Sequence, residues 1–318
     1  FGKENPSGRL AESFPKDAND CPAHTIGTFA KKDVVEYKEG VMVGYRYYDT
    51  VDTPLYYGFG HGLSYSRFVY KYMTVRPVTA SAETGGTLDA PRYELAVTVK
   101  NDSLRTGKEV VQVYYSAPTG KLEKPYQELA AYAKTKELAP GESEELIITY
   151  QVDRMASYDV QRASYVLEAG TYYVRVGVNS RATKVSAAVV LDQETVTEVL
   201  SNRLVLDCEM NELSSADVTP YGYAEEEAEK EQACKLDIAS TDIETKTVTY
   251  EETNAEIAAN TSEKKITMQD VMSGQATLDD LVGQLTIPEM AELCVGTSRG
   301  NMGLSLIHIS EPTRLALI

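Results

Sequence analysis

Apolar and polar side chains alternate with a period of two over the middle of the chain, from about Phe68 to Arg203. The clearest runs place apolar residues at Tyr93, Leu95, Val97 and Val99, at Val111, Val113 and Tyr115, at Leu146, Ile148 and Tyr150, and at Tyr172, Val174, Val176 and Val178. This alternation predicts strands with one buried side and one solvent-facing side. Turn residues such as Pro140-Gly141 and Ala169-Gly170 separate the runs, and no amphipathic helix intervenes. We therefore predict a mainly β chain containing an antiparallel β-sandwich of about 100 to 130 residues.

Residues 1–66 carry a different pattern, rich in glycine, proline and tyrosine, with one continuous apolar and aromatic run from Val41 to Tyr48. Asn5-Pro-Ser-Gly8 is predicted to be a turn, because proline presets φ and glycine accepts a positive φ. This pattern is typical of the end of a domain, so we expect the body of that domain to lie before Phe1.

The alternation is lost between residues 204 and 265. From Ala224 to Lys265 there are 12 acidic and 5 basic residues, a net charge of −7, and Tyr250 is the one aromatic residue. A stretch of this composition buries too little apolar area to offset its ordering entropy, so a solvated acidic linker is predicted. One isolated strand could form within it, at Lys246-Thr-Val-Thr-Tyr250.

Short helices are predicted after residue 266. Thr277-x-x-Asp280 and Thr286-x-x-Glu289 are capping signals, in which a hydroxyl and a carboxylate satisfy the free amides of a first helical turn. An apolar stripe at helical spacing follows, at Leu278, Leu281, Val282 and Leu285. Because that stripe needs a partner surface, residues 266–303 are predicted to begin a further domain. Residues 304–318 break the pattern and resemble a translated sequencing adapter, so we predict a non-native tail there.

The net charge of the chain argues against some classes of binding partner. The chain carries 31 Lys and Arg against 48 Asp and Glu, a net charge of −17. This acidity argues against nucleic acid and anionic membrane surfaces, which attract clustered basic side chains. No stretch approaches the ~20 apolar residues that a membrane span requires. The four cysteines are Cys21, Cys208, Cys234 and Cys294; they lie too far apart for a zinc motif or a disulfide scaffold and are interpreted as buried or incidental thiols.

Several motifs occur in a fixed order along residues 1–203. The first group is Asn5-Pro-Ser-Gly-Arg-Leu10, the run from Tyr37 to Asp49, Pro54-Leu55, and Phe59-Gly-His-Gly-Leu-Ser-Tyr65. The second is Glu109-Val-Val-Gln-Val-Tyr-Tyr115, Pro125-Tyr-Gln-Glu-Leu129, Leu138-Ala-Pro-Gly-Glu-Ser143 and Leu167-Glu-Ala-Gly-Thr-Tyr172. Together they resemble the family 3 glycoside hydrolases, the β-glucosidase and β-xylosidase group. The resemblance implies that residues 1–66 are the C-terminal end of an α/β sandwich domain and that residues 67–203 are a fibronectin type III-like domain.

The end of the chain resembles a third part of the same family. Ile266–Val271, Ala276–Leu285 and Glu289–Leu293 are similar to the opening helices of the family's (β/α)8 barrel, which usually stands at the N-terminal end. Here these helices come last, after the predicted linker at 204–265. This order resembles a permuted branch of the family, with the α/β sandwich first, the fibronectin-like domain second and the barrel third. A second, tandem enzyme beginning on the same chain is the alternative.

Retaining glycoside cleavage needs two carboxyl groups about 5 to 5.5 Å apart, one a nucleophile and one an acid with a raised pKa. The resemblance implies that the nucleophile is an Asp on the barrel, commonly in a Ser-Asp-Trp type motif, and that the acid is a Glu in the α/β sandwich. This sequence has no Trp and no Ser-Asp dipeptide. We therefore assign no catalytic residue, leave the substrate-binding residues open, and predict that this chain alone hydrolyses nothing. No metal and no cofactor is predicted.

Three other features each allow two interpretations. Gly58-Phe-Gly-His-Gly62 lacks the Lys-Ser/Thr of a phosphate loop, so a tight interdomain turn is favoured. His61 could ligate a metal or transfer a proton, but with His24 and His308 as its companions a hydrogen-bonded structural role is favoured. Five tyrosines could stack on sugar rings, although packing between modules is favoured for them: Tyr45, Tyr47, Tyr48, Tyr56 and Tyr57.

The resemblance thus implies part of a β-glucosidase-like hydrolase whose partners, β-linked glucosides or xylosides, bind through domains outside this chain. In this hypothesis the fibronectin-like module is a strut that fixes two catalytic domains relative to each other. The rival hypothesis is a fibronectin-like binding or adhesion module of a surface protein. It explains the β region and the acidic linker equally well, but it does not explain the flanking motifs. The sugar, the oligomeric state and the compartment are left open.

Overall fold

The structure is a computed structural model that describes residues 2–26, 35–78, 91–203, 205–206, 209–216, 218–250 and 265–294. It divides into two compact units, Phe1–Thr249 and Tyr250–Ile318. Strands dominate the first unit and short helices the second, so the predicted mainly β class is confirmed. The predicted non-native tail at 304–318 lies outside the described residues.

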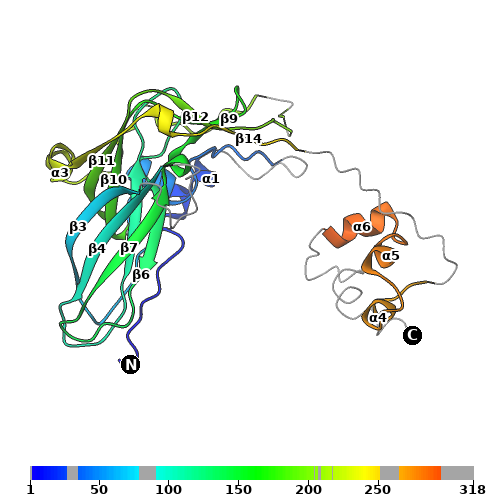
Figure 1. The fold of residues 1–318 in the computed structure, drawn as a ribbon, viewed down its shortest axis with the longest axis horizontal. Helices are drawn as coiled ribbons and strands as arrows, with labels where there is room; N and C mark the ends of the chain where they lie inside the picture. Colours follow the sequence, from blue (N-terminus) through cyan, green and yellow to red (C-terminus); the bar gives the residue numbers. More distant parts are fainter. Residues whose placement is uncertain are drawn as a thin grey trace. The chain divides into compact units, whose positions relative to one another are not determined.

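Two sheets form the body of the first unit (Figure 1). The three-stranded sheet has the order β3-β4-β7, from Phe68–Val78, Arg92–Asn101 and Ser143–Gln151. The five-stranded sheet has the order β13-β11-β10-β5-β6, from Cys234–Ile238, Ala182–Leu191, Gly170–Asn179, Val110–Ser116 and Glu128–Lys134. β13 pairs in parallel with β11, whereas the other pairings in these two sheets are antiparallel.

One hydrophobic core joins these two sheets. It contains alternate residues of β4, β7, β5 and β10: Tyr93, Leu95, Val97, Val99, Leu146, Ile148, Tyr150, Val111, Val113, Tyr115, Tyr172, Val174 and Val176. The predicted buried sides of these four strands are therefore confirmed. Val178 is the exception and is 36% exposed. The pairing of β10 with β11 shifts register between Gly177 and Asn179, so the alternation ends before Val178.

Two smaller sheets complete the first unit. A four-stranded sheet has the order β14-β12-β9-β8, from Lys246–Thr247, Thr195–Val199, Ser164–Leu167 and Ser157–Asp159. A two-stranded sheet pairs β1 and β2, Phe14–Pro15 and Leu55–Tyr57. The helices of the N-terminal region are α1, Pro22–Thr25, and α2, Tyr45–Thr50. Short 3-10 turns lie at Ala18–Asp20, Val152–Met155 and Ser240–Asp242.

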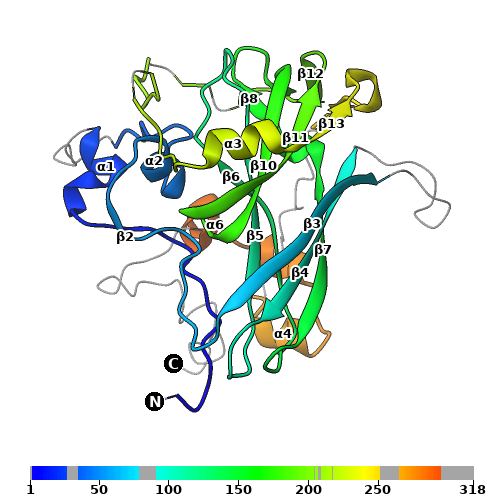
Figure 2. The ribbon, with the colours of Figure 1, turned by 90° about the vertical axis from the view of Figure 1, so that its left-hand side faces the viewer.

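Residues 218–247, which we call the strap, return to the β sheets. In the sequence this stretch was predicted to be part of a solvated linker, and for the strap that prediction is wrong. Helix α3, Glu226–Gln232, packs on β11, and β13 extends the five-stranded sheet (Figure 2). Ile238 and Ile243 join the hydrophobic core. The average composition of the stretch is acidic, but its few apolar residues are spaced so that they reach the core and stabilise the contact.

The described part of the second unit, Tyr250 and residues 265–294, contains three short helices: α4 (Met268–Met272), α5 (Leu278–Val282) and α6 (Ile287–Cys294). Thr277 and Asp280 form the predicted capping box, with Thr277 N donating to Asp280 Oδ2 at 2.9 Å. Thr286 N likewise donates to Glu289 Oε2 at 2.7 Å, so both predicted caps are confirmed. Of the helices in the described residues, none has the length and apolar character that a membrane crossing requires.

Candidate functional site: a buried ion-paired junction

The residues singled out for catalysis or metal binding lie in structural positions. Among the described residues, no three His, Cys, Asp or Glu side chains lie together in a way that could hold a metal ion. The His61 ring lies 4.8 Å from the Tyr57 ring, and the His61 carbonyl accepts from Leu10 N at 2.8 Å. His61 therefore sits inside a turn that pairs with the N-terminal segment.

Asp49 is a fully buried carboxylate on α2, and Arg181 reaches it from the turn between β10 and β11. Arg181 Nε donates to Asp49 Oδ1 at 2.6 Å. Arg181 Nη2 donates to the backbone carbonyls of Tyr48, at 2.8 Å, and Thr53, at 3.1 Å. Burial raises the pKa of Asp49, and the Arg181 charge opposes that rise without cancelling it. One guanidinium thus holds the C-terminal end of α2, and the residues just after it, against the turn between β10 and β11.

Uncharged groups extend this contact along the start of β6. Gln127 Nε2 donates to Asp49 Oδ2 at 3.1 Å and to the Ser180 carbonyl at 2.6 Å. Further along, the hydroxyl of Tyr45 accepts from Leu129 N at 2.8 Å. Helix α2 is therefore fixed by polar contacts at several points, and a sliding motion would break all of them.

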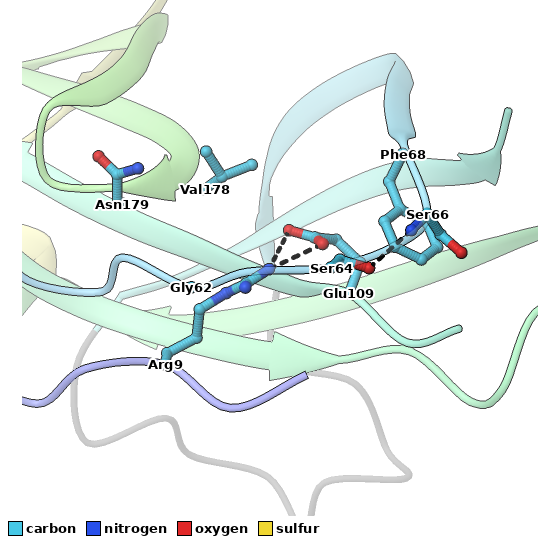
Figure 3. A pocket seen from close by; sticks show the side chains of 8 residues that line it. All are labelled: Arg9, Gly62, Ser64, Ser66, Phe68, Glu109, Val178 and Asn179. Atoms are coloured by element: carbon cyan, nitrogen blue, oxygen red, sulfur yellow. Dashed lines mark hydrogen bonds and ion pairs between the residues drawn. The ribbon is translucent and has the colours of Figure 1, made fainter. Parts of the chain in front are cut away.

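A second ion pair joins the N-terminal segment to the β sheets. Arg9 Nη2 donates to both carboxylate oxygens of Glu109 at 2.8 Å, and the two side chains point toward each other in Figure 3. The Tyr70 hydroxyl donates to Glu109 Oε1 at 3.1 Å. Burial and the Glu109 charge raise the pKa of Tyr70, which keeps this hydroxyl protonated as a donor. We call the Asp49–Arg181 and Arg9–Glu109 contacts together the junction.

An open cavity of about 210 Å³ lies beside Arg9 and Glu109 (Figure 3). Its other lining residues are Gly62, Ser64, Ser66, Phe68, Val178 and Asn179. The charges that line the cavity are already paired with each other. The cavity is therefore a feature of the junction, and we assign no substrate to it.

The glycine-rich segment Gly58–Gly62 is a turn pressed against the β strands. Gly60 has a φ of +79°, and a Cβ there would lie 2.0 Å from Gln112 Oε1. A Cβ on Gly62 would lie 2.1 Å from Arg9 Nη1. These close approaches favour glycine at both positions and support a tight turn; that the turn joins two modules stays a prediction.

A third ion pair fastens the strap. Arg175 on β10 and Glu226 on α3 are both buried, and Arg175 Nη2 donates to Glu226 Oε1 at 2.5 Å. Arg175 also donates from Nε to Ser116 Oγ at 2.7 Å and lies 4.7 Å over the Tyr126 ring. Burial alone would raise the pKa of Glu226, but the hydrogen bond and charge of Arg175 outweigh it and hold that pKa below its usual value.

The five tyrosines of the N-terminal region divide into two groups. Tyr45 stacks on Phe59 with ring centroids 4.5 Å apart, and Tyr48 is buried, with burial raising its pKa to about 12. Tyr47 is half-buried and contacts Tyr48 edge-on at 5.8 Å. These three pack within the region of the junction, whereas Tyr56 and Tyr57 have exposed side chains.

The sequence pattern did not identify the charged residues of the junction and the strap. Asp49 and Arg181 lie 132 positions apart, and Arg9 and Glu109 lie 100 apart, so neither pair has a local signal. A weak signal existed at Arg175, because an arginine stands among apolar neighbours in a predicted strand. Such a residue needs a buried acidic partner, which the strap supplies.

The sequence is similar to a known domain family and to parts of longer beta-glucosidases. The fibronectin type III-like domain family matches residues 109–180. Beta-glucosidase A of Butyrivibrio fibrisolvens is 41% identical over 64% of this chain and 26% of its own length. The beta-glucosidase of Ruminococcus albus is 33% identical over 90% of this chain and 28% of its own length. The chain thus spans about a quarter of the length of these relatives.

The fold is also similar to parts of solved beta-glucosidase structures. The beta-glucosidase of Paenibacillus barengoltzii aligns with a TM-score of 0.61 at 29% identity, over 95% of this chain and 32% of that protein. Beta-glucosidase 3B of Thermotoga neapolitana, in complex with alpha-D-glucose, aligns with a TM-score of 0.54 at 40% identity, over 61% of this chain and 26% of that protein. The Paenibacillus alignment thus extends over nearly the whole chain but under a third of that protein.

Proposed function

We propose that this chain, a β-glucosidase-like segment of glycoside hydrolase family 3, braces the catalytic domains of an enzyme that cleaves terminal β-glucosidic or β-xylosidic bonds. The observation that carries the proposal is the junction. Two ion pairs with buried carboxylates, Arg9–Glu109 and Arg181–Asp49, tie Arg9 and helix α2 to the body of the β sheets. A contact held by ion pairs and backbone hydrogen bonds has few alternative arrangements, so it fixes the N-terminal region relative to the β sheets.

Positional control matters for this chemistry. Two carboxyl groups about 5 to 5.5 Å apart must act on one glycosidic bond, and working sites hold such groups within about 0.5 Å of their productive geometry. In the proposed arrangement the nucleophile and the acid stand on different domains, so a rigid brace between those domains preserves their separation. The reactive acids themselves are assigned to no residue of this chain.

The domain assignment is part of the same proposal. Residues 1–66 would be the end of an α/β sandwich domain, residues 67–203 the fibronectin-like domain, and residues 266–303 the start of a (β/α)8 barrel. Exposed apolar side chains on the N-terminal region support a neighbour there: Phe14, Val41, Val43, Tyr56, Tyr57, Leu63 and Tyr65. An exposed set of this kind suits packing against another domain.

The substrate class comes from the relatives. They are named as beta-glucosidases, and the Thermotoga neapolitana structure holds glucose. The test is to express the complete parent gene and to assay aryl β-glucosides and aryl β-xylosides. We expect turnover by the parent enzyme and none by the 318-residue chain. A parent enzyme that is inactive on every β-glycoside would contradict the proposal.

A further inference from the structure

The outward side of the four-stranded sheet carries a row of side chains with complementary chemistry. Tyr158 on β8 pairs in register with Tyr165 on β9, Tyr165 with Glu198 on β12, and Glu198 with Lys246 on β14. Residues that pair in register project to the same face of a sheet. We call Tyr158, Tyr165, Glu198 and Lys246 the tyrosine row.

The tyrosine row faces solvent. Tyr158 and Tyr165 are 36% and 38% exposed, whereas Ser164 and Val166, the neighbours of Tyr165 along β9, are buried. The two rings have centroids 5.2 Å apart and are inclined by 58°. The pair therefore presents two joined aromatic surfaces at the end of the row, beside the carboxylate and the ammonium group.

One tyrosine is held in place by a neighbouring polar side chain. The Tyr158 hydroxyl donates to Asn202 Oδ1, and Asn202 Nδ2 donates to the Val160 carbonyl at 2.7 Å. A ring that is fixed before binding loses less side-chain entropy when a ligand stacks on it. Tyr158 is therefore pre-organised for a contact.

We propose that the tyrosine row is a non-catalytic binding surface for a neutral β-linked glucan. Strands lie about 4.8 Å apart, so four paired strands offer a strip about 14 Å long between the outer members, which accommodates a few consecutive sugar units. The C–H faces of pyranose rings stack on tyrosine, and their hydroxyls bond to carboxylate and ammonium groups.

The charges of the tyrosine row and of the whole chain favour a neutral polysaccharide over an anionic one. Glu198 and Lys246 are of opposite sign, so the row suits an uncharged ligand, while the chain's net charge of −17 repels anionic polymers. This inference rests on the proposed function, because an enzyme that cleaves β-glycosides gains from holding polymeric β-glucan nearby. It concerns binding alone, so its failure and the failure of the hydrolase proposal have different readouts.

The test is affinity electrophoresis of the full 318-residue chain in native gels that contain hydroxyethyl cellulose or carboxymethyl cellulose. These polymers share one backbone and differ in charge. We expect retardation by the neutral polymer and clearly less by the anionic one. Tyr165→Ala should weaken retention about tenfold, as loss of one stacking ring predicts, while Tyr165→Phe should keep most of it.

Tyr132→Ala is the matched control, because Tyr132 is 70% exposed on β6, in a different sheet. This variant should migrate like the unmodified chain. No retardation by hydroxyethyl cellulose, or equal retardation of the Tyr165→Ala and Tyr132→Ala variants, overturns the inference. Self-association that Tyr165→Ala abolishes would identify a protein contact on this face and would also overturn it.

Discussion

Replacing Glu226 by alanine should detach the strap. Arg175 has 1% of its side chain exposed and Glu226 has 7%, so both charges are held away from water. Removing one partner of a buried ion pair leaves the other charge uncompensated, which costs about 3 to 5 kcal/mol. Lys230 loses its 3.0 Å contact with Glu226 as well. At the lower figure of about 3 kcal/mol, the midpoint of thermal unfolding of a unit of this size should fall by about 6 to 12 °C.

Glu227→Ala is the control for this experiment. Glu227 stands next to Glu226 on α3, pairs with the same Lys230 at 2.8 Å, and has 82% of its side chain exposed. Exposed pairs contribute little, so this variant should stay within about 0.5 kcal/mol of the unmodified chain. The measurement is chemical and thermal unfolding followed by far-UV circular dichroism. Equal stabilities of the Glu226→Ala and Glu227→Ala variants would refute the assignment of a buried, strap-fastening ion pair.

Three further outcomes follow from the geometry. The pKa of Glu226 is held below the usual glutamate value, so Glu226 stabilises the fold above its unfolded pKa. That stability should be lost as the pH falls through the folded pKa. A urea-denaturation series from pH 7 to pH 3 should show the loss, with a flatter profile for Glu226→Gln; identical profiles for the variant and the unmodified chain would count against the Arg175–Glu226 pair. Gly60→Ala should lower the free energy of unfolding more than Gly141→Ala. Both glycines have a φ of +79°, but a Cβ on Gly60 would lie 2.0 Å from Gln112 Oε1, whereas a Cβ on Gly141 would have no atom within 4 Å. Equal unfolding midpoints for the two variants would disprove the close contact at Gly60. A chain that ends at Arg203 should be less stable and more prone to self-association than one that ends at Thr249. The shorter chain exposes the edge of β11 and leaves Arg175 without its partner Glu226. Light scattering and unfolding midpoints of the two chains are the measurements, and identical behaviour would contradict the stabilising role of the strap.

Local patterns predicted the strands and caps correctly because each depends on neighbours within a few residues. The alternation from Tyr93 to Val99 specifies one buried side of β4 wherever that strand is placed, and Thr277 caps its helix through Asp280, three residues away. Val178 lies beyond this rule, since a register shift depends on the partner strand. The mainly β class followed from the same local signals.

The junction depends on contacts between segments that lie far apart in the sequence, and local patterns of apolar and polar residues do not predict such contacts. Asp49 is one of 48 Asp and Glu residues. Its partners Arg181 and Gln127 come from the turn between β10 and β11 and from the residue just before β6. The strap was missed for a related reason. Its charge was averaged over a long window, while the residues that fix it are single apolar positions such as Ile238 and a single glutamate matched to Arg175.

The central claim, that the junction positions catalytic domains, is tested most directly in the parent enzyme with the double variant Asp49→Asn/Arg181→Met. Removing both charges avoids an unpaired buried ion, so the fold should survive with a small change in unfolding midpoint. The account predicts a loss of kcat/KM on an aryl β-glucoside of about tenfold to a hundredfold, because small displacements between reacting groups are costly, while Tyr132→Ala keeps full activity. A folded double variant with unchanged kcat/KM would contradict the claim.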